Sequence, residues 1–290
     1  MTTSNSSNSS NGIYDEACVL ERIKAMRSLE EKTARCRNYL TPQVDSTCRK
    51  LMVDWCFILV DAFALSRETV GVTISILDRY LSSGKGKSQE ALECRQTFQR
   101  AVVSSFMAIK INEPSVLDIK MLVKLCRGVY KQKDIIDTEM EILSAPEWRV
   151  YASSTAPMEY VRHFVDLLPE YVDVADVILE NAARRMDVAT ADVYFSTCRA
   201  SSVGMACLAG ALDEMPSMSW SDKEALWSEL SRKLDWDIAS NEIRQIEKRL
   251  LAESSSCESR MPSQASLSRT SFASTGGQPS SPGSVAQVAQ

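Results

Sequence analysis

Apolar residues recur along the chain at steps of three and four, which is the period of one face of an α-helix. Residues 98–111 are mostly apolar on all sides, as is typical of a helix at the centre of a bundle. Only six glycines occur between Ile13 and Leu251, fewer than the turns of a β-rich protein usually need. The pattern therefore predicts an all-α protein. Its strongest apolar stripe consists of Cys48, Leu51, Met52, Trp55, Ile58, Leu59, Ala62 and Phe63.

The predicted helices form two successive groups of five. Residues 13–47 hold an N-terminal amphipathic helix and a linker, residues 48–150 the first five-helix unit, and residues 151–252 the second. In each unit the third helix is the most apolar one and is expected at the centre. The helices predicted in the second unit are Pro157–Leu168, Val172–Val188, Ala191–Ala211, Asp222–Lys233 and Ala239–Leu251.

Both ends of the chain are low in complexity and rich in serine. Residues 1–12 and 253–290 hold too few apolar side chains to offset the entropy of ordering the chain, so both are expected to be disordered. In the tail, Ser281 precedes a proline and Ser271 follows an arginine by two positions. These serines are candidate phosphorylation sites, and a tail that only aids solubility is an equal alternative.

The charge balance argues against two classes of partner. With 33 basic and 38 acidic side chains, a net charge of −5 gives no basic footprint for nucleic acid. No apolar run has the length of a membrane span, and the N-terminus lacks the apolar core of a signal peptide. We therefore expect no nucleic-acid partner, no membrane partner, and a location in the nucleus or the cytoplasm.

Cysteine and histidine usage argues against a metal site and against catalysis. The nine cysteines contain no C-x-x-C pair, which predicts reduced thiols and neither a disulfide framework nor a zinc site. His163 is the single histidine and has no nucleophile motif beside it, so we expect it to be structural. No metal, cofactor or catalytic residue is predicted.

Three consecutive motifs point to a known family. Residues 48–60 have the sequence C-R-K-L-M-V-D-W-C-F-I-L-V, residues 63–70 F-A-L-S-R-E-T-V and residues 76–83 I-L-D-R-Y-L-S-S. This run resembles the cyclin box of mitotic and D-type cyclins, whose pattern is M-R-x-x-L-V-D-W, F-x-L-x-x-E-T-L and I-D-R-F-L-S. The Trp55-Cys56 pair is also similar to the cyclins of diatom algae. The resemblance implies tandem five-helix cyclin folds and a regulatory subunit of a cyclin-dependent Ser/Thr protein kinase that is not itself an enzyme.

The resemblance assigns structural roles to three residues of the box. Arg49 and Asp78 are implied to pair across the junction of the first two box helices, and Trp55 belongs to the same motif. A half-buried ion pair mostly fixes geometry, because its desolvation cost offsets much of its Coulomb gain. Two unrelated surface charges are the alternative.

The resemblance also implies a kinase-binding face. Lys110 and Glu141 match family residues that contact the kinase where its αC helix meets the lobe, and Leu117 and Ile119 are expected to add buried contact. Judged alone, Lys110 is an ordinary cation at a helix C-terminus and Glu141 an ordinary solvated carboxylate. The implied mechanism is allosteric, since a docked helical face would hold αC inward for phosphoryl transfer.

A second surface, for kinase substrates or inhibitors, is implied on the first box helix. Its residues would be Cys48, Met52 and Trp55, with Asp61 as the nearby carboxylate. Ile58 stands where the family has an acidic residue, which leaves the recognition of R-x-L peptides open. The alternative function is a cyclin-fold adaptor in transcription or signalling that activates no kinase.

Overall fold

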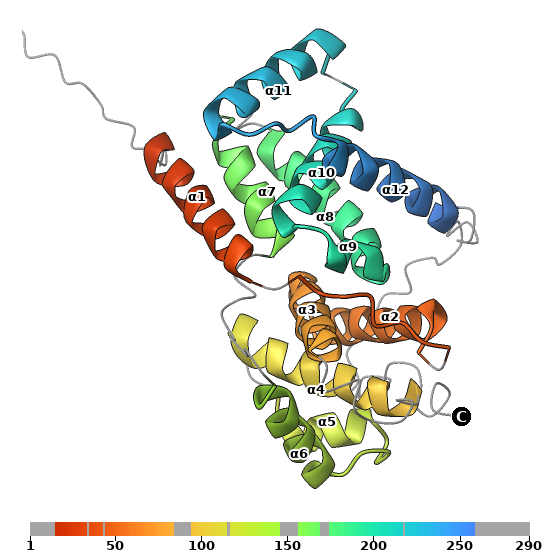
Figure 1. The fold of residues 1–290 in the computed structure, drawn as a ribbon. Helices are drawn as coiled ribbons and strands as arrows, with labels where there is room; N and C mark the ends of the chain where they lie inside the picture. The colour runs from red at the N-terminus through yellow and green to blue at the C-terminus, as the bar shows by residue number, and fades with distance from the viewer. Residues whose placement is uncertain are drawn as a thin grey trace, which may run out of the picture.

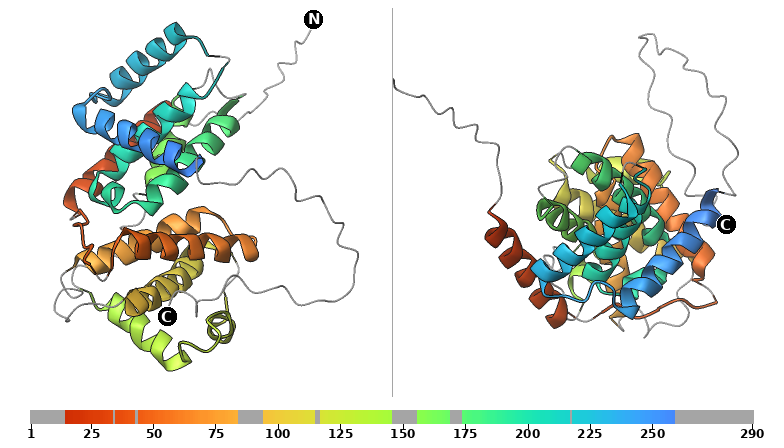
Figure 2. Two further views of the ribbon diagram at one scale, coloured as in Figure 1. Left: turned by 90° about the vertical axis from the view of Figure 1, so that its right-hand side faces the viewer. Right: turned by 90° about the horizontal axis from the view of Figure 1, so that it is seen from above.

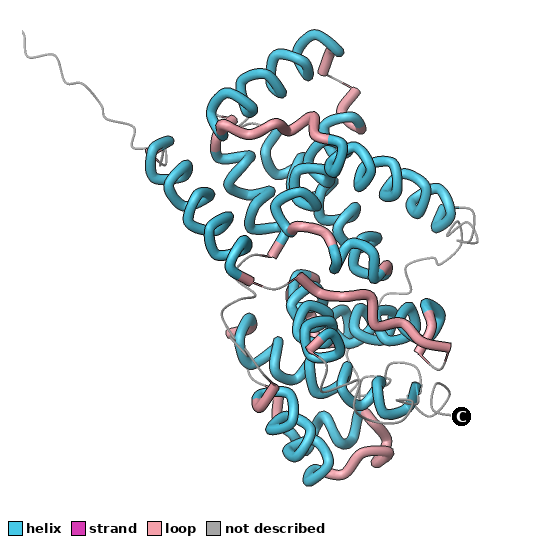
Figure 3. The backbone as a smooth tube through the Cα atoms, in the orientation of Figure 1, coloured by secondary structure: helices cyan, strands magenta, loops and turns pink. Residues whose placement is uncertain are grey.

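The computed structural model describes residues 15–33, 35–42, 44–83, 94–114, 117–145, 156–168, 174–216 and 218–258. Across these ranges the chain forms twelve α-helices and no strand, which confirms the all-α prediction (Figures 1 and 3). Residues 1–12, Ser271 and Ser281 lie outside the described residues. The helices are α1 (Glu16–Lys32), α2 (Ser46–Ala62), α3 (Glu68–Ser82), α4 (Cys94–Asn112), α5 (Ile119–Leu125), α6 (Gln132–Leu143), α7 (Pro157–Asp166), α8 (Ala175–Ala191), α9 (Val193–Thr197), α10 (Ala200–Asp213), α11 (Trp220–Leu234) and α12 (Asn241–Glu258).

Aspartate is the N-cap residue of four of these helices. Asp15, Asp45, Asp118 and Asp192 each accept a hydrogen bond from a backbone N–H of the following first turn, which would otherwise lack a partner. The single helix expected over 191–211 is instead two helices, because α9 ends at Thr197, the backbone is extended at Cys198 and Arg199, and α10 begins at Ala200. Within the described residues the second unit therefore holds six helices where five were expected. At the other end, α12 runs to Glu258, six residues into the tail that was expected to be disordered.

The first unit, α2–α6, is built around α4 as its apolar sequence predicted. Buried residues of α4 pack against α2 and α3 in one hydrophobic cluster. At its centre Trp55 meets Phe98 edge to face, with ring centroids 5.6 Å apart. Trp55 is buried, which agrees with its predicted structural role.

The second unit, α7–α12, is built around α10, and α1 packs on this unit. Val19 and Ile23 are buried in the second cluster, and Figure 1 shows α1 lying alongside α7. Polar contacts fix the two ends of α1: Lys233 Nζ lies 2.9 Å from a carboxylate oxygen of Glu16. Near the other end, Glu30 accepts from the backbone N–H of Ser201 at 3.0 Å.

Close packing around α10 requires glycine at two positions. A Cβ at Gly204 would lie 2.7 Å from the carbonyl oxygen of Pro157 at the start of α7. A Cβ at Gly210 would lie within 2.6 Å of three atoms of the Arg185 guanidinium group on α8. The small residues of α10 therefore let two neighbouring helices approach its backbone directly.

The two units meet at α9. Val193 is buried in the core of the first unit and Phe195 in the core of the second, so this short helix belongs to both. An ion pair crosses the same junction, where Arg67 Nε lies 3.1 Å from Asp187 of α8. The views in Figure 2 show the two helical groups stacked along the molecule.

A disulfide links α2 to α4 and corrects the expectation of reduced thiols. Cys48 and Cys94 are bonded, with their Cα atoms 6.2 Å apart although 46 positions separate them in sequence. Packing of α2 against α4 creates this proximity, and cysteine spacing along the chain cannot reveal it. Cys48 is buried, as its position on the apolar stripe predicted.

Two glycine variants test the packing around α10. Gly204→Ala should lower the free energy of unfolding by about 1–3 kcal/mol, because the new methyl group meets a backbone carbonyl that cannot move aside. Gly71→Ala in α3 is the matched control, since no atom lies within 4 Å of its Cβ position. It should raise the free energy of unfolding by about 0.5–1 kcal/mol through helix propensity. Urea denaturation measures both, and equal effects would contradict the packing described for α10.

Candidate functional site

The guanidinium group of Arg49 ties together four parts of the chain. Its Nη2 donates to Asp78 Oδ2 on α3 at 3.0 Å and to the carbonyl oxygen of Thr190 on α8 at 3.1 Å. Its Nη1 donates to Asp78 Oδ1 and to the hydroxyl of Tyr39 in the linker. The Tyr39 hydroxyl in turn donates to Asp78 Oδ1 at 2.6 Å. The predicted pairing of Arg49 with Asp78 is confirmed, and we call these four residues the Arg49 cluster.

Burial and charge act together in the Arg49 cluster. The side chains of Arg49 and Asp78 are only 2% and 3% exposed. Burial lowers the pKa of Arg49, but the carboxylate of Asp78 and the Tyr39 oxygen outweigh it and raise the pKa above its usual range. Burial and the Asp78 charge raise the pKa of Tyr39 well above its ordinary value. The cluster therefore keeps a charged arginine and a neutral phenol, the states that its hydrogen bonds require.

Lys110, at the end of α4, pairs with Glu139 of α6. The ammonium group makes an ion pair with the Glu139 carboxylate and lies 4.2 Å from the centroid of the Phe106 ring. Both charged side chains retain partial exposure, 34% for Lys110 and 19% for Glu139. The structure thus presents a positive and a negative group side by side at the crossing of two helices.

Glu141 makes contacts within the first unit, and its side chain keeps 36% exposure. Its carboxylate accepts from Arg100 Nη2 of α4 at 2.8 Å and from the hydroxyl of Tyr80 of α3. Burial raises the pKa of Tyr80, and donation to Glu141 raises it further. Glu141 therefore links α6 to α3 and α4. The carboxylate beside Lys110 belongs to Glu139, which the sequence interpretation missed.

An apolar stripe surrounds the Lys110–Glu139 pair. On α6, Ile136, Met140 and Leu143 are spaced by four and three residues and therefore share one face of the helix. All three are exposed, Met140 by 58%, as is Ile111 next to Lys110. Exposed apolar side chains grouped around a charged pair are typical of a protein interaction site. We call Lys110, Ile111, Ile136, Glu139, Met140 and Leu143 the α4–α6 face.

Leu117 and Ile119, predicted to add contact area, have a mixed role. Both are partly buried and pack against the core of the first unit. Their remaining surface lies at the start of α5, a helix that packs against α6. Leu117 and Ile119 therefore help to pack the first unit. The exposed apolar side chains near Lys110 are those of the α4–α6 face, and not Leu117 or Ile119.

The first unit also matches a known family in sequence. Residues 21–151 match the family model described as the N-terminal domain of cyclins. G2/mitotic-specific cyclin-2 of Antirrhinum majus is 29% identical over 154 residues, which are 51% of this chain and 33% of that protein. Cyclin-B1-1 of Arabidopsis thaliana is 30% identical over 166 residues, 56% of this chain and 35% of that protein. Residues 21–151 of this chain belong to the cyclin family.

The fold agrees with this membership. The X-ray structure of a viral cyclin from herpesvirus saimiri aligns with a TM-score of 0.56 over 81% of this chain and 97% of the viral chain, at 18% identity. The match to the two plant cyclins covers about a third of their length. The matched residues 21–151 include Tyr39, Arg49 and Asp78 of the Arg49 cluster and the whole α4–α6 face, whereas Thr190 lies in the second unit.

The substrate-docking patch implied on α2 does not lie on the surface of this cyclin. Met52 has no exposed surface, Trp55 is 4% exposed, and Cys48 is held in the disulfide. Asp61 is exposed, but its carboxylate pairs with Arg67 at 2.9 Å. Cys48, Met52 and Trp55 face inward because they belong to the apolar stripe of α2 that packs on α3 and α4. The predicted patch is therefore wrong as a surface for substrates or inhibitors, and the exposed apolar residues of α2 are Leu51 and Ile58.

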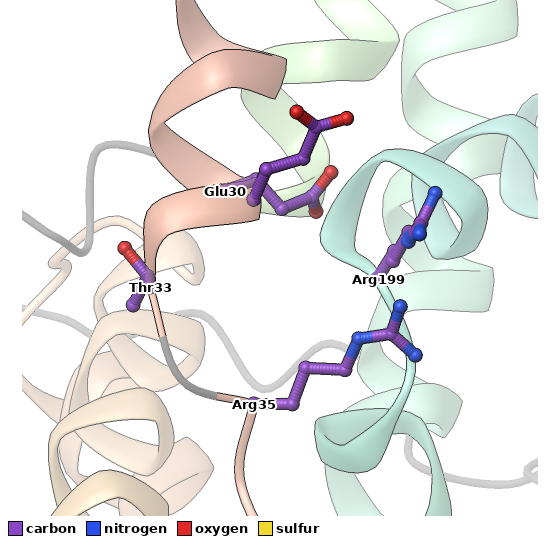
Figure 4. A pocket seen from close by; sticks show the side chains of 5 residues that line it. Glu30, Thr33, Arg35 and Arg199 are labelled. Carbon is purple, nitrogen blue, oxygen red and sulfur yellow. The ribbon is translucent and has the colours of Figure 1, made fainter.

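A small pocket lies where α1 and the linker meet the start of α10. Figure 4 shows Glu30, Thr33 and Arg35 on one side and Arg199 on the other. Glu30, which lines the pocket, also accepts a hydrogen bond from the hydroxyl of Ser201 at 2.6 Å and thereby helps to hold α1 on the second unit. The pocket thus lies beside the contact that holds α1 against the start of α10.

Among the described residues, no group of three or more His, Cys, Asp or Glu side chains is arranged to hold a metal ion. No helix there has both the length and the apolar character needed to cross a membrane. His163 is buried in α7, with its Nδ1 3.3 Å from a carboxylate oxygen of Asp166.

The Arg49 cluster should contribute strongly to the stability of the cyclin box. Asp78→Asn leaves the buried guanidinium group without its countercharge, so the free energy of unfolding should fall by about 3–5 kcal/mol. Glu21→Gln is the control, because Glu21 and Lys24 form an ion pair with both side chains largely exposed. It should change the free energy of unfolding by less than about 1 kcal/mol. Urea denaturation followed by circular dichroism compares them, and a small effect of Asp78→Asn would contradict this role.

Proposed function

We propose that this cyclin is a regulatory subunit that binds a cyclin-dependent Ser/Thr protein kinase, activates it, and thereby controls progression through the cell cycle. The α4–α6 face is the observation that carries the proposal. It combines an exposed apolar stripe with a lysine and a glutamate in one place on the cyclin box. The name of the Antirrhinum majus relative, a G2/mitotic-specific cyclin, supports a role in the cell cycle.

The chemistry of the α4–α6 face suits a helix as its partner. The C-terminal end of a helix exposes backbone carbonyl groups that lack partners within the helix, and the N-terminal end exposes such N–H groups. Lys110 can donate to such carbonyls and Glu139 can accept from such N–H groups, with the added strength of charged hydrogen bonds. Ile136, Met140 and Leu143 then supply the apolar contact that excludes water around them.

The proposed mechanism acts on the kinase through the position of its αC helix. In protein kinases a glutamate of αC must pair with the lysine that holds the ATP phosphates before phosphoryl transfer proceeds. A rigid partner that prefers the inward position of αC shifts the kinase toward its active state. The cyclin contributes a binding surface to this step, and the reacting groups belong to the kinase. We therefore propose an activating subunit without enzymatic activity of its own.

The double variant Lys110→Ala/Glu139→Ala tests this function. It should weaken association with a cyclin-dependent kinase at least about tenfold, equal to about 1.4 kcal/mol, because both polar contacts to the αC end are lost. Pull-down and titration against a panel of purified cyclin-dependent kinase subunits measure the loss. Circular dichroism should show unchanged helix content, since the two side chains pair with each other and neither belongs to the hydrophobic cluster of the first unit.

Glu141→Gln is the matched comparison within α6. It should lower the melting temperature, because Arg100 and Tyr80 lose their charged acceptor, while kinase association below the melting transition is retained. Unchanged binding by the double variant would contradict the assignment of the α4–α6 face. Wild-type binding without any rise in histone phosphorylation would favour the adaptor alternative.

A further inference from the structure

The disulfide of this cyclin lies between the first turns of two long helices. Cys48 is the third residue of α2 and Cys94 the first residue of α4. Cys48 is buried, whereas Cys94 is partly exposed. The bond therefore has one sulfur that solvent can reach and one that the core protects.

The disulfide coexists with free thiols. Among the described cysteines, Cys18, Cys36, Cys56, Cys126, Cys198 and Cys207 are not bonded. Burial raises the pKa of Cys56, Cys126 and Cys207 to about 12, so these thiols form little of the thiolate that reacts with oxidants. The bond between Cys48 and Cys94 thus reflects their particular placement and not a general oxidation of the protein.

The placement also suits reactivity in the reduced state. The first turn of a helix has backbone N–H groups without helical partners and the positive end of the helix dipole, which favour a thiolate. At α2 the Asp45 carboxylate already accepts from the backbone N–H of Cys48 at 2.8 Å, which reduces this advantage for Cys48. Cys94, at the start of α4 and partly exposed, is the better first target of an oxidant.

We propose that Cys48 and Cys94 form a reversible redox clamp on the cyclin box, closed by hydroperoxides and opened by thiol reductants. The Cys94 thiolate attacks hydrogen peroxide, which breaks the O–O bond, forms a sulfenic acid and releases hydroxide. The Cys48 thiolate then attacks that sulfur, forms the disulfide and releases a second hydroxide. With the two protons of the original thiols, the products are one disulfide and two waters. Two equivalents of a reducing thiol return both cysteines and leave that thiol as its own disulfide.

The closed clamp stabilises the part of the box that holds the Arg49 cluster. It joins the turn that carries Arg49 to the central helix α4, and it closes a chain segment that includes all of α3. A crosslink of this length removes conformational entropy from the unfolded chain, and so raises the melting temperature. Lys110 lies at the opposite end of α4, so the clamp changes stability and leaves the kinase-binding residues in place. The inference is thus independent of the proposed function.

The experiment compares the full chain after treatment with hydrogen peroxide and after treatment with dithiothreitol under native conditions. Peptide mass spectrometry without reduction should find the peptides of Cys48 and Cys94 joined only in the oxidised sample. The oxidised sample should melt about 10 °C higher than the reduced one. Dithiothreitol should reverse both changes and peroxide should restore them.

Two variants serve as test and control. Cys94→Ser, at the partly exposed position, should abolish the crosslink and the shift in melting temperature, whereas Cys18→Ser, at an exposed free thiol, should preserve both. The comparison of oxidised and reduced wild-type protein needs no variant, so a poorly folded Cys94→Ser leaves the test intact. A bond that native dithiothreitol does not open would make it a permanent structural link and overturn the proposal. Equal melting temperatures in the two states, or an undiminished shift in a folded Cys94→Ser, would overturn it as well.

Discussion

The buried guanidinium group of Arg49 on α2 connects three further segments of the chain. The linker supplies Tyr39, α3 supplies Asp78, and the second unit supplies the carbonyl of Thr190 at the end of α8. The Nη1 and Nη2 atoms of this buried charge have acceptors while Nε has none, so the charge is tolerated only with its countercharge and with these segments present together. It therefore fixes the linker, the first box helices and the second unit in one arrangement, and α9 fills the remaining junction with Val193 and Phe195.

This arrangement separates support from recognition within the cyclin box. Arg49 and Asp78 are buried and hold helices in place, and Glu141, with its side chain 36% exposed, pairs with Arg100. Lys110 and Glu139 pair only with each other among charged groups of the described chain, and keep exposure beside the apolar stripe of α6. A rigid support beneath an exposed face is the condition under which a regulatory surface can shift the state of a partner without deforming itself.

The pattern of apolar and polar residues predicted much of the fold, but it could not predict contacts between residues that lie far apart in the sequence. The Arg49–Asp78 pair lies within one motif and was predicted from it, whereas the Thr190 carbonyl is 141 positions from Arg49. Glu139 and Glu141 are two residues apart, which turns them about 200° from each other around the helix axis. Ile135 and Ile142 mark the buried side of α6, and Ile136, Met140 and Leu143 the exposed side, but only the crossing of α4 over α6 shows which glutamate Lys110 reaches. The disulfide likewise depends on how α2 and α4 pack against each other.

The central claim is that the α4–α6 face is where a cyclin-dependent kinase binds. Amide hydrogen exchange of the full chain, alone and with a purified kinase subunit, tests it most directly, because exchange reports which backbone segments become protected. If the kinase binds there, amide exchange should slow at the end of α4 and along α6, residues 106–112 and 132–143, and should change little in α11. Protection confined to the second unit, or to the exposed side of α2 around Leu51 and Ile58, would contradict it.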